Sequence, residues 1–256
     1  MGIAKLLAVY RQHRSVRRFL LKVFLYKANF KQVRGHWIFT PSIGRDSIVL
    51  DFGANRGMFA KEMEEQFGCT CYLFDANSEL CKLMDFEEKS RVHHLALTSA
   101  DCELEFNISE NDEASSVGGD FQHSWKYVKK EKVRGMSYPS VISMLQLNDK
   151  KIEVVKVDIE GSELDFIESL EAETVKNINQ ITIEFHDWLN EKLHERTVAA
   201  INKLVNYGYL PVTDAKSHKE VIEMLFIKKS TLKLGASQKW WLSLFNSLKF
   251  LPLASR

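Results

Sequence analysis

The sequence contains few of the residues that interrupt or cross-link a chain. Of its 256 residues, only four are proline and 12 are glycine, and no stretch rich in proline, glycine or serine divides it. With 45% hydrophobic residues, the chain is expected to form one large domain around a substantial core. Its four cysteines lack CxxC spacing, which argues against common zinc and redox motifs and predicts free thiols in a reducing compartment.

Long apolar runs are missing as well. Lys or Arg interrupts the hydrophobic stretches at both ends of the chain before about 18 residues, so neither end is expected to span a membrane. The apolar run at the N-terminus stops at Arg11 and no small-residue cleavage site follows, which does not fit a secretory signal. The protein is therefore expected to be cytoplasmic.

Negative charge is absent from both ends of the chain. Ten basic and no acidic residues lie between Met1 and Arg45, and six basic and no acidic residues follow Glu223. Because the whole chain holds 35 basic and 34 acidic residues, the body between these ends has a net charge of −15. An acidic body does not suit a general nucleic-acid binder, so no nucleic-acid partner is expected.

Both basic ends are expected to be helical. Apolar and basic side chains of residues 9–30 would lie on opposite faces of a helix, and a Trp- and Leu-rich stretch near the C-terminus repeats the pattern. Such helices bind the anionic inner face of a membrane peripherally, or they pack on their own domain or form a homodimer interface; both interpretations stay open. The expected organisation is a basic helical extension over residues 1–45, a folded domain over 46–230 and a basic aromatic tail over 231–256.

Between the two ends, short apolar runs alternate with stretches of helical spacing. The expected strands are residues 47–53, 70–77, 91–99, 152–161, 180–188, 209–214 and 220–229. The expected helices are residues 58–67, 78–88 (capped by Ser78), 141–148, 162–170 and 195–208, and residues 101–119 look irregular. This order predicts an α/β fold with a doubly wound, mostly parallel seven-stranded sheet and an antiparallel hairpin at its edge.

The first of these strands runs into a turn with two glycines, in the sequence VLDFGANRGMF over residues 49–59. Gly53 and Gly57 do not match the G-x-G-x-x-G pattern of dinucleotide-binding proteins. The D-x-G-x-x-x-G pattern instead resembles the first motif of S-adenosylmethionine-dependent methyltransferases. Asp51 would face the ammonium group of that cofactor and Gly53 would let the backbone approach it, with Asn55 and Gly57 completing the cofactor-binding turn.

A second acid closes the next strand. Asp75 lies 24 residues after Asp51, close to the spacing of about 20 residues that Rossmann-type units show before a ribose-binding acid. Asp75 is therefore expected to bind the two ribose hydroxyls, while Ala96 and Leu97 would pack against the adenine ring. The alternative for both acids is a role in turns and at helix N-termini.

A third motif follows the fourth strand, in the sequence VVKVDIEGSELDFI. Asp158 ends this strand and Glu160 shares its face, so both are expected beside the methyl group that is transferred. Gly161 permits a tight turn, and Glu163 is expected to complement the dipole of the following helix.

The segments VLDFGANRGMFA, FDANSEL, SSV, VVKVDIEGSELDFIESL and ITIEFHDW, in this order and spacing, resemble the FkbM family of methyltransferases. The resemblance extends from about Ile48 to Ile227, and the chain departs from it where Asp75-Ala76 replaces the usual Glu-Pro. It implies a class I methyltransferase (Rossmann-like) fold with S-adenosylmethionine as methyl donor. It also implies, most often, O-methylation of a hydroxyl, here on a small molecule such as a sugar, a glycan or a related natural product.

Methyl transfer to a hydroxyl needs a base that accepts the hydroxyl proton. His186, at the end of the fifth strand, is the leading candidate because histidine titrates nearest to neutrality. Asp158 or Glu160 would take this role in a dry site that raises carboxyl pKa values. A metal ion held by Asp158, Glu184 and His186 is a further alternative, since it would lower the pKa of the acceptor hydroxyl.

Two other classes of protein stay open at this point. A nicotinamide-dependent oxidoreductase shares the strand–turn–helix arrangement, but it would need the third glycine of its fingerprint. A non-catalytic scaffold would keep the fold without the activity, and the acids at the strand ends argue against it.

Overall fold

The computed structural model describes residues 25–26, 28–84, 86, 91–109, 116–117, 127–186, 193–213, 222–232, and 235. The expectations for the basic stretch before residue 25 and for the aromatic tail after residue 235 lie outside the described residues. Among the residues that the structure describes, no helix is both long and apolar enough to cross a bilayer.

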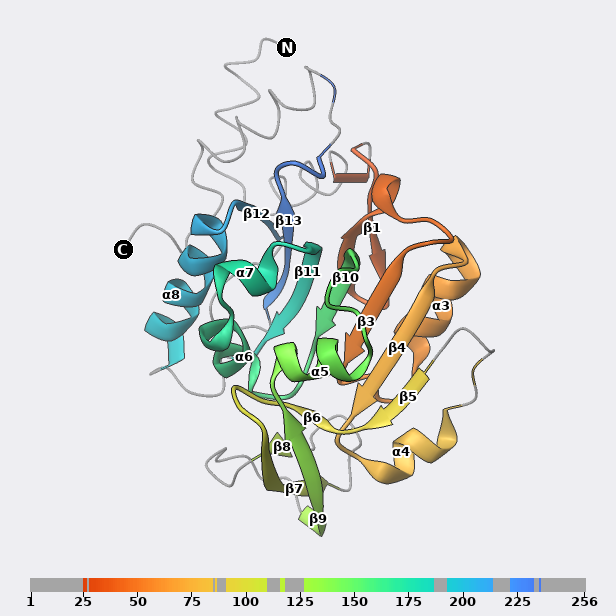
Figure 1. The fold of residues 1–256 in the computed structure, drawn as a ribbon, viewed down its shortest axis with the longest axis vertical. Helices are drawn as coiled ribbons and strands as arrows, with labels where there is room; N and C mark the ends of the chain where they lie inside the picture. The colour runs from red at the N-terminus through yellow and green to blue at the C-terminus, as the bar shows by residue number, and fades with distance from the viewer. Residues whose placement is uncertain are drawn as a thin grey trace, which may run out of the picture.

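A seven-stranded sheet forms the centre of the fold (Figure 1), in the order β12-β13-β11-β10-β3-β4-β5. Its strands are β3 (Ile48–Phe52), β4 (Thr70–Asp75), β5 (Arg91–His94), β10 (Ile152–Val157), β11 (Ile178–Phe185), β12 (Tyr209–Val212) and β13 (Ile222–Lys228). The neighbouring pairs from β11 to β5 are parallel, and β13 is antiparallel to both β11 and β12. The predicted mostly parallel, seven-stranded sheet is confirmed, and the antiparallel strand lies second from the edge.

Helices cover the sheet because its central strands are apolar on both faces; every residue of β10 is buried. One face packs against α5 (Tyr138–Met144), α6 (Glu163–Ser169), α7 (Ala172–Val175) and α8 (Leu193–Asn206). The other face packs against α3 (Met58–Phe67). The short helix α4 (Ser78–Leu83) follows β4, and its N-cap is Asn77 rather than the expected Ser78, because the Asn77 side chain accepts the backbone N–H of Glu79.

The described part of the N-terminal extension contains a β-hairpin, which the sequence analysis did not predict. Strand β1 (Phe30–Val33) and strand β2 (His36–Phe39) are joined by Arg34 and Gly35, whose φ angles of 50° and 96° suit a tight hairpin turn. Apolar side chains of the hairpin pack on β12 and β13, so residues 30–39 of the extension that was expected to be helical form strands. A short 3-10 helix, η1 (Thr40–Ser42), leads on towards β3.

Gln180 of β11 fixes this hairpin to the sheet. Its Oε1 accepts the backbone N–H of Phe39 at 2.8 Å, and its Nε2 donates to the Phe39 carbonyl at 3.0 Å. The side-chain amide of Gln180 thus forms the two hydrogen bonds with the Phe39 backbone that a neighbouring strand would form. These hydrogen bonds are buried. This contact fixes the position of β2. His36, at the start of β2, lies at the end of the main sheet where charged side chains gather.

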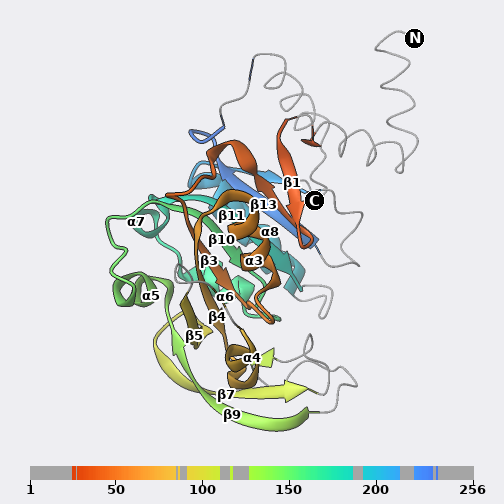
Figure 2. The same ribbon diagram turned by 90° about the vertical axis from the view of Figure 1, so that its right-hand side faces the viewer.

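A second, four-stranded sheet lies at one end of the molecule (Figures 1 and 2), in the order β6-β9-β7-β8. Its strands are β6 (Ala96–Leu97), β7 (Cys102–Ser109), β8 (Ser116–Val117) and β9 (Tyr127–Met136). Two expectations fail here: the strand predicted over residues 91–99 breaks between β5 and β6, and part of the segment 101–119 forms strands. The alternation of buried Phe106 and Ile108 with exposed Glu103 and Glu105 in β7 is the signal that was missed.

Candidate active site

The turn between β3 and α3 packs against the end of β10. Gly53 has a φ of 73°, and a Cβ added to it would lie 1.7 Å from the carbonyl oxygen of Asp158. Gly57, with a φ of 70°, would place a Cβ 2.5 Å from the Phe86 ring. Both glycines are therefore required by neighbouring protein atoms, which is a different reason from the expected approach to a ligand.

Asp75 joins the ends of β3 and β4, as the spacing of the two motifs predicts. Its Oδ2 accepts the backbone N–H of Asn55 at 2.7 Å, and its Oδ1 accepts that of Asn77 at 2.8 Å. Burial raises the pKa of Asp75 above its usual value, although the two N–H groups act in the opposite direction. Each oxygen keeps one lone pair, so the carboxylate can still accept hydrogen bonds from two neighbouring hydroxyls.

A buried lysine, which the sequence analysis missed, links the first and third motifs. Lys156 Nζ lies 3.2 Å from Asp51 Oδ1 and 3.4 Å from Asp158 Oδ2, and it donates to the Gly53 carbonyl at 2.7 Å. Burial disfavours the ammonium, but the charges of Asp51 and Asp158 outweigh this effect and raise the pKa of Lys156. Asp51 is fully buried as the partner of Lys156, which differs from the expected position facing a ligand.

Glu163 organises the turn that follows β10. Its Oε1 accepts the backbone N–H groups of Ile159 and Gly161, at 3.2 and 3.0 Å. The same oxygen lies 3.0 Å from Nδ1 of His186. Glu163 is 2% exposed, and its hydrogen bonds connect the turn to the end of β11. Its role therefore goes beyond the expected interaction with the helix dipole.

His186 is the expected base, but its surroundings keep it protonated. Burial favours the neutral ring, whereas the hydrogen bond to Glu163 and the charges of Glu163, Glu160 and Asp158 raise the pKa of His186 to about 10. At neutral pH the ring therefore already carries both protons and cannot accept another. It acts as a cation among acids, with Nε2 at 3.4 Å from Glu160 Oε2 and 3.7 Å from Glu184 Oε1.

Glu160 has the properties that the base requires. Burial and the nearby charges of Asp158, Glu163 and Glu184 raise the pKa of Glu160 to about 8, although His186 acts in the opposite direction. Its side chain is 33% exposed, so an acceptor from solution can reach it. Glu160 also has a φ of 54°, a left-handed backbone conformation that is uncommon for residues other than glycine and is enriched at functional sites.

The acids at this end of the sheet form two neighbouring groups. Ligand atoms of Asp158, Glu160 and His186 lie within 4.8 Å of one another, and so do those of His36, Glu184 and Glu223. The predicted metal set of Asp158, Glu184 and His186 is thus divided between the two groups. We call the four carboxylates Asp158, Glu160, Glu184 and Glu223 the acidic rim.

The expected adenine-flanking residues are both buried, in different surroundings. Leu97 packs in the main core on the α5 side of the sheet. Ala96 packs with Phe106 and Val133 of the second sheet. Both belong to β6, directly after the break that follows β5.

The residues of this site fit S-adenosylmethionine, the cofactor expected from the motifs. Asp75 offers free lone pairs to a pair of ribose hydroxyls. Asp51 is fully buried beside Lys156 Nζ, at 3.2 Å, so it would stabilise the glycine turn and would not contact the cofactor itself. Ionised carboxylates of the acidic rim would stabilise a sulfonium cation bound beside them.

Replacing Asp75 with Ala is expected to weaken binding of S-adenosylhomocysteine by about 10- to 150-fold, because a hydrogen bond to a charged group is worth about 1.5–3 kcal/mol. Isothermal titration calorimetry measures this directly. Asp101→Ala is the matched control, since Asp101 also accepts a backbone N–H, from Ser137 at 2.9 Å, but lies exposed before the second sheet. Equal affinities in a folded Asp75→Ala variant and the wild type would exclude the ribose contact.

Comparison with known proteins gives one family. The family model described as the methyltransferase FkbM domain matches residues 51–225, well over half of the chain. No curated protein matches the chain closely enough to count as a relative.

Solved structures of similar arrangement include three methyltransferase-related proteins. Precorrin-6y C5,15-methyltransferase from Geobacter metallireducens has 11% identity and a TM-score of 0.41, covering 82% of this chain and 88% of its own. The Methanococcus jannaschii fibrillarin pre-rRNA processing protein has 12% identity and a TM-score of 0.44, covering 80% and 73%. TrmK from M. capricolum, in complex with S-adenosyl-homocysteine, has 8% identity and a TM-score of 0.37, covering 80% and 78%. At such identities and scores, these likenesses do not bear on what the present chain acts on.

Proposed function

Because this chain belongs to the FkbM methyltransferase family, we propose that it methylates a hydroxyl group of a sugar, a glycan or a related natural product, with Glu160 as the proton acceptor. Family membership makes the chain an S-adenosylmethionine-dependent methyltransferase. The proposal adds the class of acceptor and the role of each residue. The observation that carries it is the position of Glu160, partly open to solvent in the turn after β10 and 3.4 Å from His186 Nε2, where burial raises its pKa to about 8.

A hydroxyl must lose its proton to become an effective nucleophile. When bound, S-adenosylmethionine supplies an electrophilic methyl group. The Glu160 carboxylate would accept the proton that the acceptor hydroxyl loses as it takes up this methyl group. Since a pKa of about 8 leaves an ionised fraction at neutral pH while making the carboxylate more basic than an ordinary one, Glu160 suits this step.

His186 would hold Glu160 in place for that step. Its Nδ1–H is directed at Glu163 and its Nε2 lies 3.4 Å from Glu160 Oε2, so the ring spans two carboxylates from opposite sides. The cation would also keep part of the Glu160 population ionised by lowering its pKa. His186 is thus a positioning residue for the base, and Asp158, whose carboxylate lies within 4.8 Å of the ligand atoms of Glu160 and His186, adds negative charge beside it.

The charge of the acidic rim supports an uncharged, hydroxyl-rich acceptor. Those carboxyl groups of the rim that are ionised would repel an anionic acceptor such as a phosphorylated or nucleic-acid substrate. Carboxylates are hydrogen-bond acceptors that match the many donors of a polyol. A sugar or glycan hydroxyl therefore fits the rim better than a phosphate-rich partner does.

The proposal is tested by methyl transfer from S-adenosylmethionine carrying a ¹³C-methyl group to a panel of neutral sugars, amino sugars and hydroxylated natural products. The expected product gives an O-methyl resonance in a ¹³C–¹H correlation spectrum, on a neutral acceptor. Transfer only to nitrogen, carbon or sulfur would refute the hydroxyl assignment. Phosphorylated counterparts of the best acceptor serve as the control and are expected to react more slowly.

A further inference from the structure

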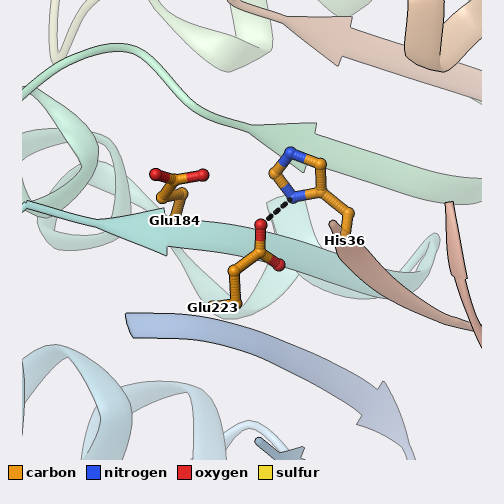
Figure 3. A group of neighbouring side chains, drawn as sticks. All are labelled: His36, Glu184 and Glu223. Atoms are coloured by element: carbon orange, nitrogen blue, oxygen red, sulfur yellow. Dashed lines mark ion pairs between the residues drawn. The ribbon is translucent and has the colours of Figure 1, made fainter. Parts of the chain in front are cut away.

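A second set of polar side chains meets beside the proposed base, and the mechanism above does not use it. His36 comes from the β1–β2 hairpin, Glu184 from β11 and Glu223 from β13, and Figure 3 shows the three side chains converging on one point. Glu184 and Glu223 are direct partners across the antiparallel pair β11–β13. Their ligand atoms and those of His36 all lie within 4.8 Å of one another.

Two like charges directly opposite each other on neighbouring strands destabilise a sheet. The other basic groups near this end of the sheet are shared among several acids: Lys156 contacts Asp51 and Asp158, and His186 lies near Glu160 and Glu163 as well as Glu184. Within the described part of the chain, the acids of this region therefore outnumber the basic side chains placed against them. A cation bound between Glu184 and Glu223 would remove this repulsion.

The His36 ring is placed to contribute to such a site. Its side chain is 4% exposed, and the buried Nδ1 forms no hydrogen bond although Glu223 Oε1 lies only 3.3 Å away. Oε2 of Glu223 is also buried without a hydrogen-bond donor. A buried nitrogen and a buried carboxylate oxygen without hydrogen bonds, on facing side chains, are available as ligand atoms for a cation.

From this geometry we propose that His36, Glu184 and Glu223 bind one divalent first-row metal ion, of the Mn²⁺ or Zn²⁺ type. Imidazole nitrogen and carboxylate oxygen are ligands that these ions accept together. Bonds of about 2.0–2.1 Å at a tetrahedral centre place two ligand atoms about 3.3 Å apart, which is the separation of His36 Nδ1 and Glu223 Oε1. The Glu184 carboxylate completes the set by a small side-chain movement.

The surroundings of the three residues are those of a metal site. The second ring nitrogen of His36, Nε2, lies 3.8 Å from Asp158 Oδ2, and ligating histidines commonly direct their other nitrogen at a carboxylate in this way. The side chains of Glu184 and Glu223 are 24% and 17% exposed, which leaves an entry path and room for water ligands. The neighbouring group is less suited, because Nδ1 of its His186 is engaged by Glu163.

Such an ion would tie the hairpin to the sheet. It would connect residue 36 to residues 184 and 223, across the interface between the hairpin and the main sheet. The hydrogen bonds of Gln180 hold the other side of this interface together. Because the metal binds only when these three elements are assembled, it would stabilise the folded state in proportion to its concentration above Kd. This role is independent of the identity of the methyl acceptor.

Titration of the metal-free full-length protein with MnCl₂ tests the proposal, with electron paramagnetic resonance of free Mn²⁺ and calorimetry with ZnCl₂ as readouts. One ion is expected per chain, together with a rise in the melting temperature. His36→Gln and Glu223→Gln are each expected to weaken binding at least about 10-fold. Glu103→Gln, an exposed glutamate of the second sheet, is the matched control and should bind as the wild type does.

Two results would overturn the proposal. One is the absence of saturable binding of either ion. The other is binding that Glu160→Gln abolishes and Glu223→Gln leaves unchanged, which would assign the ion to Asp158, Glu160 and His186. Far-UV circular dichroism and calorimetric affinity for S-adenosylhomocysteine show whether each variant is folded, and Glu184→Gln replaces any variant that is not.

Discussion

Replacing Lys156 with Met is expected to lower the free energy of unfolding by about 3–5 kcal/mol, the usual cost of removing one partner from a buried ion pair. The methionine would fill much of the same space, but Asp51 and Asp158 would lose the cation between them and the Gly53 carbonyl would lose its donor. Since the free energy of unfolding of small domains is about 5–15 kcal/mol, the variant would lose a large part of its stability. Urea denaturation at neutral pH, followed by circular dichroism, measures the loss.

Lys130→Met is the matched control for this experiment. Lys130 pairs with Glu105 at 3.0 Å on the exposed face of the second sheet, where an ion pair is worth about 0–1 kcal/mol. Adding Asp51→Asn to Lys156→Met should recover part of the lost stability, because it removes one of the two uncompensated charges. Equal losses for Lys130→Met and Lys156→Met, or no recovery in the double variant, would contradict the role given to Lys156.

Replacing Glu160 with Gln is expected to reduce kcat by about 10²- to 10⁴-fold, the usual contribution of a positioned general base. Glutamine keeps the size and a hydrogen-bonding carbonyl, so the acceptor still binds, but it cannot take the hydroxyl proton. The affinity for S-adenosylhomocysteine should change little. Initial rates of methyl transfer at saturating acceptor measure kcat, with Glu103→Gln as the control for the substitution itself.

The pH dependence gives an independent check on the same residue. Glu160 must be ionised and its pKa is about 8, so the wild-type rate should rise as the pH increases through about 8. His186 must stay protonated and its pKa is about 10, so the rate should fall again above that pH. The rising limb should disappear in Glu160→Gln, measured in metal-free buffer. A rising limb that persists there would assign the base to another residue.

The sequence predicted the structure best for features that depend on residues close together in the chain. Six of the seven strands of the main sheet are largely apolar runs (β5 is the exception), and their order along the chain is enough to predict a mostly parallel sheet. Asn55 and Asp75 meet because one follows β3 and the other ends β4, the neighbouring strand. Such relations depend on a few residues around each turn.

The residues that were missed depend on partners far away in the sequence. Lys156 looks out of place in the apolar strand VVKVD, and that anomaly was a usable signal of a buried partner. No local pattern marks His36, because its partners Asp158 and Glu223 are more than a hundred residues away. The role of His186 was misjudged for the same reason, since Glu163 and Glu160 determine its protonation.

The position of β13 affects how the nascent chain assembles. This strand is the last of the main sheet to be synthesised, yet it lies between β11 and β12, which precede it. During translation, β11 therefore keeps an unpaired edge, and the hairpin formed early from residues 30–39 lacks part of the surface on which it packs. Glu223 also arrives with β13, so the group around His36 can be completed only near the end of synthesis, whereas Asp75 and Asn55 can meet soon after the first strands emerge.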